Sequence, residues 1–362
     1  MKKYVLLSVL SVLTILLSYS CSSTKDSHAY LNHSQKPSNI ILMIGDGMST
    51  PQVYAAILTS ENPTSFERFP VTGLVKTYSK SHKITDSAAG GTAIATGHKT
   101  NNGMIGMDSD SIPVPSILEM LSEKRMKTGV IATSYITHAT PASFVAKNIN
   151  RNNYEEIAMD FAQSDKVDLL IGGGKKHFTS RKDGVNLIDK MVSEGWNYYD
   201  TLTNIDKNDK IMILASDDHL PSYPSRGNFL PDASALALEK LSKSKTGFFL
   251  MIEGSQIDFA AHNSDSTYLV NEMHDFDNTI NKVLDFAEKD GNTLVVVTAD
   301  HETGGLTMID PNGHYTETYF NFSTGSHSPL LVPLFAFGPG SENFSGIIEN
   351  TDIIKIILKI ME

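Results

Sequence analysis

Residues 39–47 read Asn-Ile-Ile-Leu-Met-Ile-Gly-Asp-Gly, an apolar run that ends in a short polar turn. A strand that is apolar on both sides is expected where helices cover both faces of a parallel sheet. Seven more β-rich runs follow, many of them equally continuous, at 72–78, 129–133, 167–171, 210–215, 247–252, 293–298 and 332–337. Together with residues 39–44, these runs predict a central sheet of mainly parallel strands.

Helical patterns lie between or after these runs, at residues 51–60, 116–124, 154–163, 233–242, 268–289 and 352–361. Ser49 and Thr50 precede Pro51, which is a favourable arrangement for the start of a helix. The alternation of strand and helix predicts an α/β fold with helices on both faces of the sheet. We expect one such domain over residues 37–362.

The N-terminus has the pattern of a bacterial export signal. Two lysines precede an apolar stretch, residues 4–17, that is too short for a transmembrane helix and typical of a signal peptide. Ser20 and Cys21 then resemble the end of a lipobox. We therefore expect a signal peptide over residues 1–20, lipidation of Cys21 and a flexible, lipid-anchored tether over 21–36. Such a protein would be a periplasmic or cell-surface lipoprotein; a plain secreted protein with an incidental Cys21 is the alternative.

The composition limits the class of function. Hydrophobic residues make up 40% of the 362 residues and charged residues 20%, as in ordinary globular proteins. The net charge of −11 argues against nucleic-acid binding and against electrostatic attachment to anionic lipid. Cys21 is the only cysteine, so histidine and carboxylate side chains are left as ligands for any metal ion.

Polar residues follow four of the expected strands. Asp46 follows the first run, Glu253 follows residues 247–252, and Asp300 with His301 follows residues 293–298. The run at 129–133 leads into Thr137 and His138. Ligands of open parallel sheets bind beyond the carboxyl ends of the strands. A single acidic residue there is often only a turn former, but four such ends in one sheet favour a binding site.

The segment after Glu253 has the spacing of a metal site. Asp258 and His262 are four residues apart, so on a helix they share a face and can bind one ion. Glu253 precedes this pair and could serve a second ion. The alternative is a surface Asp–His pair that stabilises the helix by roughly 0.2–0.5 kcal/mol.

Ser87 lies at the expected start of a helix, before the small residues Ala-Ala-Gly-Gly. The helix N-terminus favours a bound anion, and it would equally favour the alkoxide of a serine nucleophile. The alternative is that Asp86 or Ser87 only caps the helix. No Gly-x-Ser-x-Gly elbow surrounds Ser87, and the chain has no phosphate-binding loop of the nucleotide-hydrolase type.

Five motifs together resemble the alkaline phosphatase family. They occur in the family's order within residues 39–328, at 39–48, 85–89, 139–142, 253–262 and 298–301. The resemblance implies a parallel-sheet fold, two Zn²⁺ ions, one Mg²⁺ ion and a serine nucleophile that becomes phosphorylated. Its substrates would be small-molecule phosphate monoesters, cleaved to an alcohol and inorganic phosphate.

The resemblance also implies a role for each matching position. Ser87 matches the nucleophile, and Arg151 matches the arginine that binds phosphate. The first zinc would be bound by Asp258, His262 and His327. The second would be bound by Asp46, Asp300, His301 and the oxygen of Ser87. The magnesium would be bound by Asp46, Thr140 and Glu253.

Three features depart from the best-studied bacterial pattern. His138 stands beside the magnesium ligands, where those enzymes have aspartate, and we count it with the substrate-binding residues. Phe259 stands where other members have Lys, His or Trp. Only 25 residues separate His301 from His327, so the crown insertion of larger members is expected to be reduced. The sequence leaves open whether the chain is a monomer or a homodimer.

Two other functions remain as alternatives. Related architectures hydrolyse phosphodiesters or sulfate esters, although the Cys/Ser-x-Pro-x-Arg pattern of sulfatases does not surround Ser87. A zinc-binding lipoprotein without catalytic activity is the other alternative. Ser87 and Arg151 argue against it, because metal storage needs neither residue.

Overall fold

The computed structural model describes residues 36–310, 313 and 319–362. The expected signal peptide, Cys21 and nearly all of the tether lie outside these residues, so their assignment stays a prediction. Within the described part of the chain, no helix is both long enough and apolar enough to cross a membrane.

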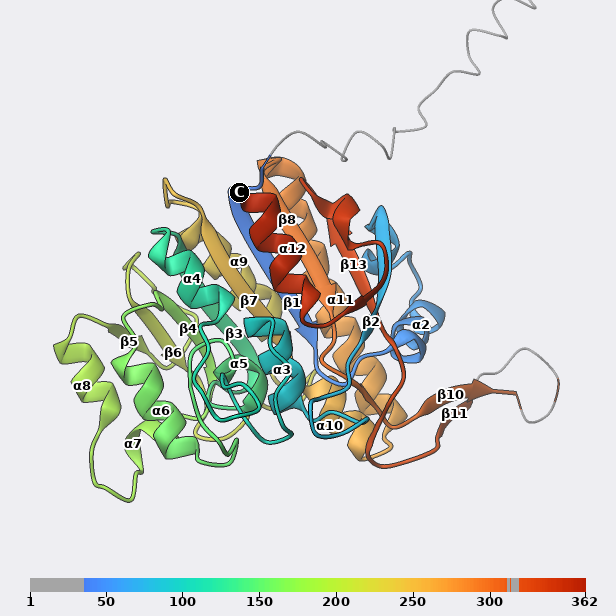
Figure 1. The fold of residues 1–362 in the computed structure, drawn as a ribbon, viewed down its shortest axis with the longest axis horizontal. Helices are drawn as coiled ribbons and strands as arrows, with labels where there is room; N and C mark the ends of the chain where they lie inside the picture. Colours follow the sequence, from blue (N-terminus) through green and yellow to red (C-terminus); the bar gives the residue numbers. More distant parts are fainter. Residues whose placement is uncertain (1–35, 311–312, 314–318) are drawn as a thin grey trace, which may run out of the picture.

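A ten-stranded sheet runs through the centre of the molecule (Figure 1). Its strand order is β14-β2-β13-β8-β1-β7-β3-β4-β6-β5. All neighbouring strands are parallel except β13, which is antiparallel to both β2 and β8. The bounds are β1 Asn39–Gly45, β2 Val71–Lys76, β3 Lys127–Tyr135, β4 Leu169–Gly173, β5 Asn197–Tyr199, β6 Ile211–Leu214, β7 Phe248–Gly254, β8 Thr293–Thr298, β13 Val332–Phe337 and β14 Gly346–Glu349.

Helices cover both faces of this sheet (Figure 1). One layer contains α2 Thr50–Thr59, α9 Phe229–Leu241 and α11 Ser266–Asp290, with α10 Gln256–His262 packed against α11. The other contains α3 Ser87–Thr96, α4 Ile117–Glu123, α5 Ala139–Ala142 and α12 Asp352–Met361. Near the β4–β6–β5 edge lie α6 Tyr154–Gln163, α7 Lys176–Thr179 and α8 Leu187–Ser193. Two short 3₁₀ helices are η2 Ser65–Arg68 and η3 Ser341–Phe344.

The centre of the sheet brings the four expected polar strand ends together. β8, β1, β7 and β3 are consecutive neighbours, and every residue of β1, β7 and β8 is buried. Ile44 of β1 lies opposite Glu253 of β7 on one side and Thr298 of β8 on the other. The strands therefore end level with one another, as a binding site beyond their carboxyl ends requires.

The predicted α/β fold is confirmed, with its eight predicted strands and six predicted helices in place. The short strands β5 and β14, at the two ends of the sheet, were not predicted from the sequence. Two small antiparallel sheets were also not predicted: the β10 Leu306–Ile309 and β11 Tyr319–Phe322 hairpin, and the pairing of β9 Glu302–Thr303 with β12 His327–Ser328. The β10–β11 hairpin occupies the segment between His301 and His327 and extends away from the sheet (Figure 1).

A buried ionic cluster fixes the loop before α9 onto α11. The Arg226 guanidinium donates to Glu272 at 2.7 Å and to Asp275 at 2.6 Å, and all three side chains are at most 2% exposed. The backbone N–H of Tyr223 also donates to Glu272, at 2.8 Å. One cation faces two carboxyl groups, and Asp275 Oδ1 has no hydrogen-bond partner among the described residues.

Candidate active site

Ser87 is the first residue of α3, a helix whose ten residues are all buried. Asp86 is its N-cap and accepts a hydrogen bond from the N–H of Ala89 at 3.0 Å. The small residues of this helix allow it to pack closely, because a Cβ at Gly90 would lie only 2.8 Å from the carbonyl oxygen of Asp300. Capping by Asp86 leaves the Ser87 hydroxyl free to face the strand ends, where its Oγ lies 3.1 Å from Nε2 of His301.

Asp258, His262 and His327 form the first of three clusters of possible metal ligands. Asp258 and His262 share one face of α10, and their Oδ1 and Nε2 atoms are 3.3 Å apart. His327 comes from β12, with its Nε2 3.7 Å from the same carboxylate oxygen and 3.1 Å from Nε2 of His262. The Asp258–His262 pair therefore gains a third possible metal ligand, Nε2 of His327, from a distant part of the chain.

Asp46, Asp300 and His301 form the second cluster, which is fully buried. His301 Nε2 lies 3.4 Å from Asp46 Oδ1 and 3.3 Å from Asp300 Oδ2. The imidazole rings of His301 and His327 stack with centroids 3.6 Å apart, so the first two clusters are adjacent. Ser87 lies beside them.

The three histidines of these clusters are oriented in the same way. Nδ1 of His262 lies 2.9 Å from the carbonyl oxygen of Gly325, and Nδ1 of His327 lies 2.8 Å from that of Thr85. Nδ1 of His301 lies 3.2 Å from the hydroxyl of Thr303. Because an oxygen atom of the protein contacts Nδ1 of each ring, Nε2 faces the cluster and is free to bind a metal ion. Metal-binding histidines are commonly oriented in this way.

The third cluster contains Asp46, His138 and Glu253. Glu253 Oε2 accepts a hydrogen bond from Ser255 at 2.6 Å, whereas its Oε1 has no partner among the described residues. Thr140, at the start of α5, is fully buried, and its hydroxyl also has no such partner. The predicted oxygen ligands of magnesium, from Asp46, Thr140 and Glu253, are thus buried. The imidazole of His138 adds a nitrogen atom that could also bind a metal ion.

The protein itself does not balance the negative charge that the carboxyl groups of the second and third clusters would carry, so without a cation their pKa values rise. Burial, and then the charge of Asp300, raises the pKa of Asp46 well above its usual value. Burial raises the pKa of Glu253 to about 8 and that of Asp300 to about 6. Both oxygens of Asp46 lack a hydrogen-bond partner among the described residues. Buried carboxylates of this kind are found with metal ions, so these residues fit bound cations.

Asp258 of the first cluster is different, because it has histidines around it. Burial alone would raise the pKa of Asp258, but the hydrogen bond to His262 and the positive charge of the histidines outweigh burial and lower it. The same hydrogen bond raises the pKa of His262 to about 9. Nitrogen donors dominate this cluster and oxygen donors the third, which favours a softer ion in the first and a harder ion in the third.

Arg151 faces the same region and is held from two sides. Its Nη1 donates to Asp86 Oδ2 at 3.2 Å, and that oxygen also accepts from the N–H of Gly103 at 3.0 Å. Its Nη2 lies 3.4 Å from Nε2 of His138. Burial, and then the charge of Arg151, lowers the pKa of His138 well below its usual value, so that imidazole is neutral and can accept from the guanidinium.

Two further residues, Thr303 and His219, contact the predicted site residues, although neither was predicted from the sequence. Thr303 donates to Asp258 and contacts His301, which links the first two clusters. His219 contacts the rings of Phe259 and His138, with centroids 4.9 and 5.7 Å away. Thr303 lies only two residues after His301, so a scan of polar residues next to the predicted ligands would have found it. No sequence pattern marks His219, which reaches the site through tertiary packing.

Every residue named as a site candidate from the sequence lies at this end of the sheet, except Cys21, which is outside the described residues. The α/β fold with a serine and an arginine beside three carboxylate and histidine clusters defines a metal-binding hydrolase. The family model of alkaline phosphatase matches residues 37–321. The chain therefore belongs to the alkaline phosphatase family, whose members are phosphoric monoester hydrolases.

Curated and solved relatives agree with this assignment. Alkaline phosphatase 4 of Bacillus subtilis is 33% identical, over 98% of this chain and 96% of its own. The alkaline phosphatase of the Antarctic bacterium TAB5 is 45% identical, with a TM-score of 0.88 over 90% of this chain and 99% of its own. A cold-active alkaline phosphatase of Shewanella is 30% identical, with a TM-score of 0.82 over 90% of this chain and 100% of its own.

Proposed function

We propose that this chain hydrolyses phosphate monoesters to an alcohol and inorganic phosphate through a phosphoserine intermediate on Ser87. The observation that carries the proposal is the position of the Ser87 hydroxyl. It lies at the N-terminus of α3, 3.1 Å from His301 and beside two clusters of metal-type ligands. A hydroxyl used only as a helix cap would not require this position, and Asp86 already caps the helix.

The metal ligands divide into three sets. Zinc would be held by Asp258, His262 and His327 and, at a second site, by Asp46, Asp300, His301 and Ser87. Magnesium would be held by Asp46, Thr140 and Glu253, with His138 beside them. A solved histidine-to-aspartate variant of the TAB5 enzyme has Mg bound in its M3 site, which supports a hard ion in this family. When bound, the ions supply positive charge that lowers the pKa of the Ser87 hydroxyl and stabilises the leaving oxygen.

The remaining roles belong to side chains of the chain itself. The Arg151 guanidinium would bind two phosphoryl oxygens through its paired N–H groups. Asp86 positions that guanidinium, and the neutral imidazole of His138 supports its other nitrogen. Arg151 and the helix N-terminus thus make the site attractive to an anion although the whole chain carries a net charge of −11.

The reaction takes two displacements at phosphorus. In the first, Ser87 Oγ forms a bond to phosphorus as it loses its proton, and the ester oxygen leaves and is protonated to the alcohol. In the second, water forms a bond to phosphorus, and Ser87 Oγ leaves and regains a proton. Inorganic phosphate is the product. Arg151 can bind the same two phosphoryl oxygens throughout, which holds the reacting group in place.

Labelling of Ser87 tests this proposal. We expect incubation with radioactive phosphate at acidic pH to label one serine, found by peptide mapping at Ser87. Ser87→Ala should lose the label and most of the turnover. Ser193→Ala, at an exposed serine of α8, is the matched control and should keep both. Full activity of Ser87→Ala would disprove the covalent mechanism.

We also propose that the chain is exported, cleaved before Cys21 and diacylated at that cysteine, with the folded domain over residues 37–362 facing away from the cytoplasm. The signal-like stretch at 4–17 and the single cysteine shortly after it support this proposal. Mass spectrometry of the mature N-terminus should find a lipidated Cys21. An unmodified terminus at another residue would disprove it.

A further inference from the structure

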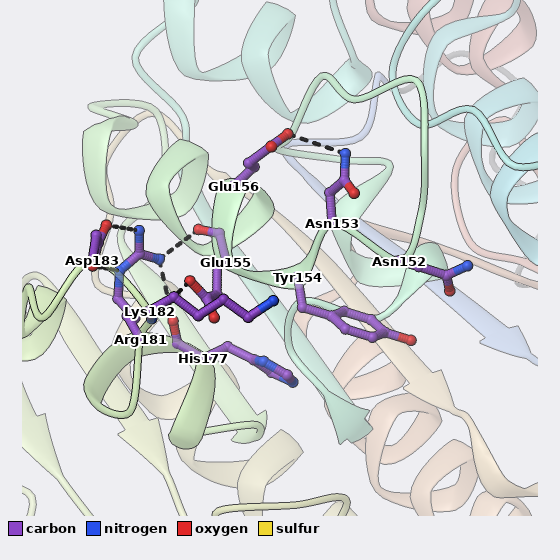
Figure 2. Close-up of a pocket in the computed structure, with 9 residues that line it drawn as sticks. All are labelled: Asn152, Asn153, Tyr154, Glu155, Glu156, His177, Arg181, Lys182 and Asp183. Atoms are coloured by element: carbon purple, nitrogen blue, oxygen red, sulfur yellow. Dashed lines mark hydrogen bonds and ion pairs between the residues drawn. The ribbon is translucent and has the colours of Figure 1, made fainter.

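A cavity of about 480 Å³ opens beside α6 and α7, outside the three ligand clusters (Figure 2). Its size is that of pockets that bind small organic molecules. It begins at Asn152, the residue directly after Arg151, and is lined by Asn152, Asn153, Tyr154, Glu155, Glu156, His177, Arg181, Lys182 and Asp183. The proposed phosphate-binding residue and this cavity are therefore adjacent in the chain.

Aromatic rings connect the cavity with the proposed active site. Tyr154 and His177, which line the cavity, stack with centroids 4.8 Å apart at an interplanar angle of 28°. Tyr135 packs its edge against both rings and stacks on His219 at 3.6 Å. His219 in turn contacts His138, the neighbour of Arg151. The rings thus contact one another in series from His138, beside Arg151, to Tyr154 and His177 at the cavity.

The charges of the cavity do not suit a second anion. Arg181 is bound to Asp183 and to the carbonyl oxygens of Glu155 and His177 (Figure 2). Three acidic side chains line the cavity against two basic ones. Burial, and then the charge of Lys176, lowers the pKa of His177 to about 4, so its ring is neutral at neutral and alkaline pH. What remains is a polar rim around uncharged ring faces.

We propose that this cavity binds the base of nucleoside 5′-monophosphates while their phosphate lies against Arg151 and Ser87. A neutral, planar heterocycle stacks on rings such as Tyr154 and His177, and stacking accepts purines and pyrimidines alike. The carboxamide of Asn152 offers one acceptor and two donors to the edge of a base. Three peptide units, at most about 11 Å, separate the Cα atoms of Arg151 and Tyr154, a span that a ribose and a base can cover.

This inference rests on the proposed function and names a substrate class for it. The test compares adenosine 5′-monophosphate with ribose 5-phosphate, because both have the same reacting phosphate and a primary alcohol as leaving group. We expect the enzyme to favour the nucleotide by about fivefold or more in kcat/KM, mainly through a lower KM. Tyr154→Leu should remove this preference by slowing the nucleotide alone, and Tyr154→Phe should retain it.

Tyr78 provides the matched control. It is an exposed tyrosine that lines a separate cavity of about 430 Å³, with Lys80, Lys83 and Lys99 among its other residues. Tyr78→Leu should leave unchanged the ratio of kcat/KM for adenosine 5′-monophosphate to that for ribose 5-phosphate. Loss of the preference in Tyr78→Leu but not in Tyr154→Leu would overturn the proposal, as would equal slowing of both substrates by Tyr154→Leu.

Equilibrium dialysis gives a second readout that needs no turnover. Adenosine 5′-monophosphate should bind the Ser87→Ala enzyme about fivefold more weakly when Tyr154→Leu is added, while ribose 5-phosphate should bind both proteins equally. The two proposals fail in different ways. If neither substrate is hydrolysed, the proposed function is wrong. If both are hydrolysed with equal kcat/KM, only the assignment of the cavity is wrong.

Discussion

Two regions of this molecule bury several carboxyl groups, and they balance that charge differently. At the ends of β1, β7 and β8, the carboxyl groups of Asp46, Glu253 and Asp300 are fully buried. On α11, Glu272 and Asp275 are equally buried, but the guanidinium of Arg226, from the loop before α9, is bonded to both. The first region has unpartnered carboxylate oxygens facing one another, whereas the second has a cation of the protein itself.

The difference separates a binding site from a structural element. Burying a carboxylate costs several kcal/mol unless a counter-charge is close. Arg226 supplies most of that counter-charge during folding, so its cluster needs no ligand. The strand ends have Arg151 nearby, but its guanidinium is bonded to Asp86 and His138. The carboxyl groups there have raised pKa values without cations and are suited to take them up.

Removal of the metals should have the largest effect and tests the first half of this comparison. We expect dialysis against a chelator to lower activity by at least about 100-fold. Each ion held at 100 times its Kd stabilises the native state by about 2.7 kcal/mol, so loss of two or three ions should cost roughly 5 kcal/mol or more. Calorimetry before chelation, after it and after zinc and magnesium are returned measures this loss. An unchanged melting temperature would contradict the comparison.

Removal of Arg226, the buried cation of the second region, tests the second half of the comparison. Arg226→Met leaves Glu272 and Asp275 buried without a counter-charge and should destabilise the protein by about 3–5 kcal/mol. Replacement of all three residues by Met, Gln and Asn should recover much of that loss, because no buried charge remains. Urea denaturation of the three proteins gives the values. A loss that is the same in the triple variant would show that packing, rather than charge, is at stake.

The pH dependence of stability sharpens the comparison, because the single positive charge of Arg226 faces two carboxyl groups, those of Glu272 and Asp275. Burial, partly opposed by Arg226, raises the pKa of Asp275 to about 6. In the unfolded chain its pKa is about 3.9. The stability that this proton contributes is present below about pH 3.9 and is lost as pH rises through 6. The loss should be about 2 to 3 kcal/mol.

Asp275→Asn measures that contribution. The free energy of unfolding of the wild type, minus that of Asp275→Asn, should fall between pH 4 and pH 6.5. Metal loss at low pH affects both proteins and cancels in this difference. Asp285→Asn, at an exposed partner of Arg68, is the control and should show no such trend. A flat difference for Asp275→Asn would mean that Arg226 balances both carboxyl groups.

The smallest expected effect concerns Phe259, next to Asp258. Its ring contacts His219 and His138 and offers no hydrogen bond to phosphate. A lysine there could bond phosphate through a water molecule, so Phe259→Lys should tighten inhibition by inorganic phosphate about fivefold, or about 1 kcal/mol. Turnover at alkaline pH should slow with it, since product would leave later. Phe259→Leu removes the ring without adding a donor and should leave the inhibition constant unchanged.

The strand pattern predicted the central part of the fold and the polar residues at the strand ends for the same reason, whereas His327 and Arg151 were identified only by the family resemblance. Strands buried on both faces are continuous apolar runs, and the runs at 39–44 and 293–298 end directly before the segments that contain Asp46 and Asp300. Their positions could therefore be read from the chain. The roles of the clustered residues remain predictions until they are tested by substitution.

Other features could not be read from the sequence because they arise between distant segments. Ser87 and His301 are separated by 214 positions; the family resemblance implied that they share a metal site, but only the fold gives the 3.1 Å between Ser87 Oγ and His301 Nε2. His219 follows no recognisable pattern yet stacks on Tyr135. The strands β5 and β14 are too short, at three and four residues, for an alternating pattern to be clear.

The orientation of the histidines has a consequence for mutational robustness. His262 and His327 have their Nδ1 atoms beside carbonyl oxygens of Gly325 and Thr85, which belong to the main chain. No substitution of a side chain can delete a carbonyl group. His301 depends instead on the hydroxyl of Thr303, which a single nucleotide change can remove. Random drift of this gene would therefore loosen the ligand set first at His301, the histidine that contacts Ser87, the proposed nucleophile.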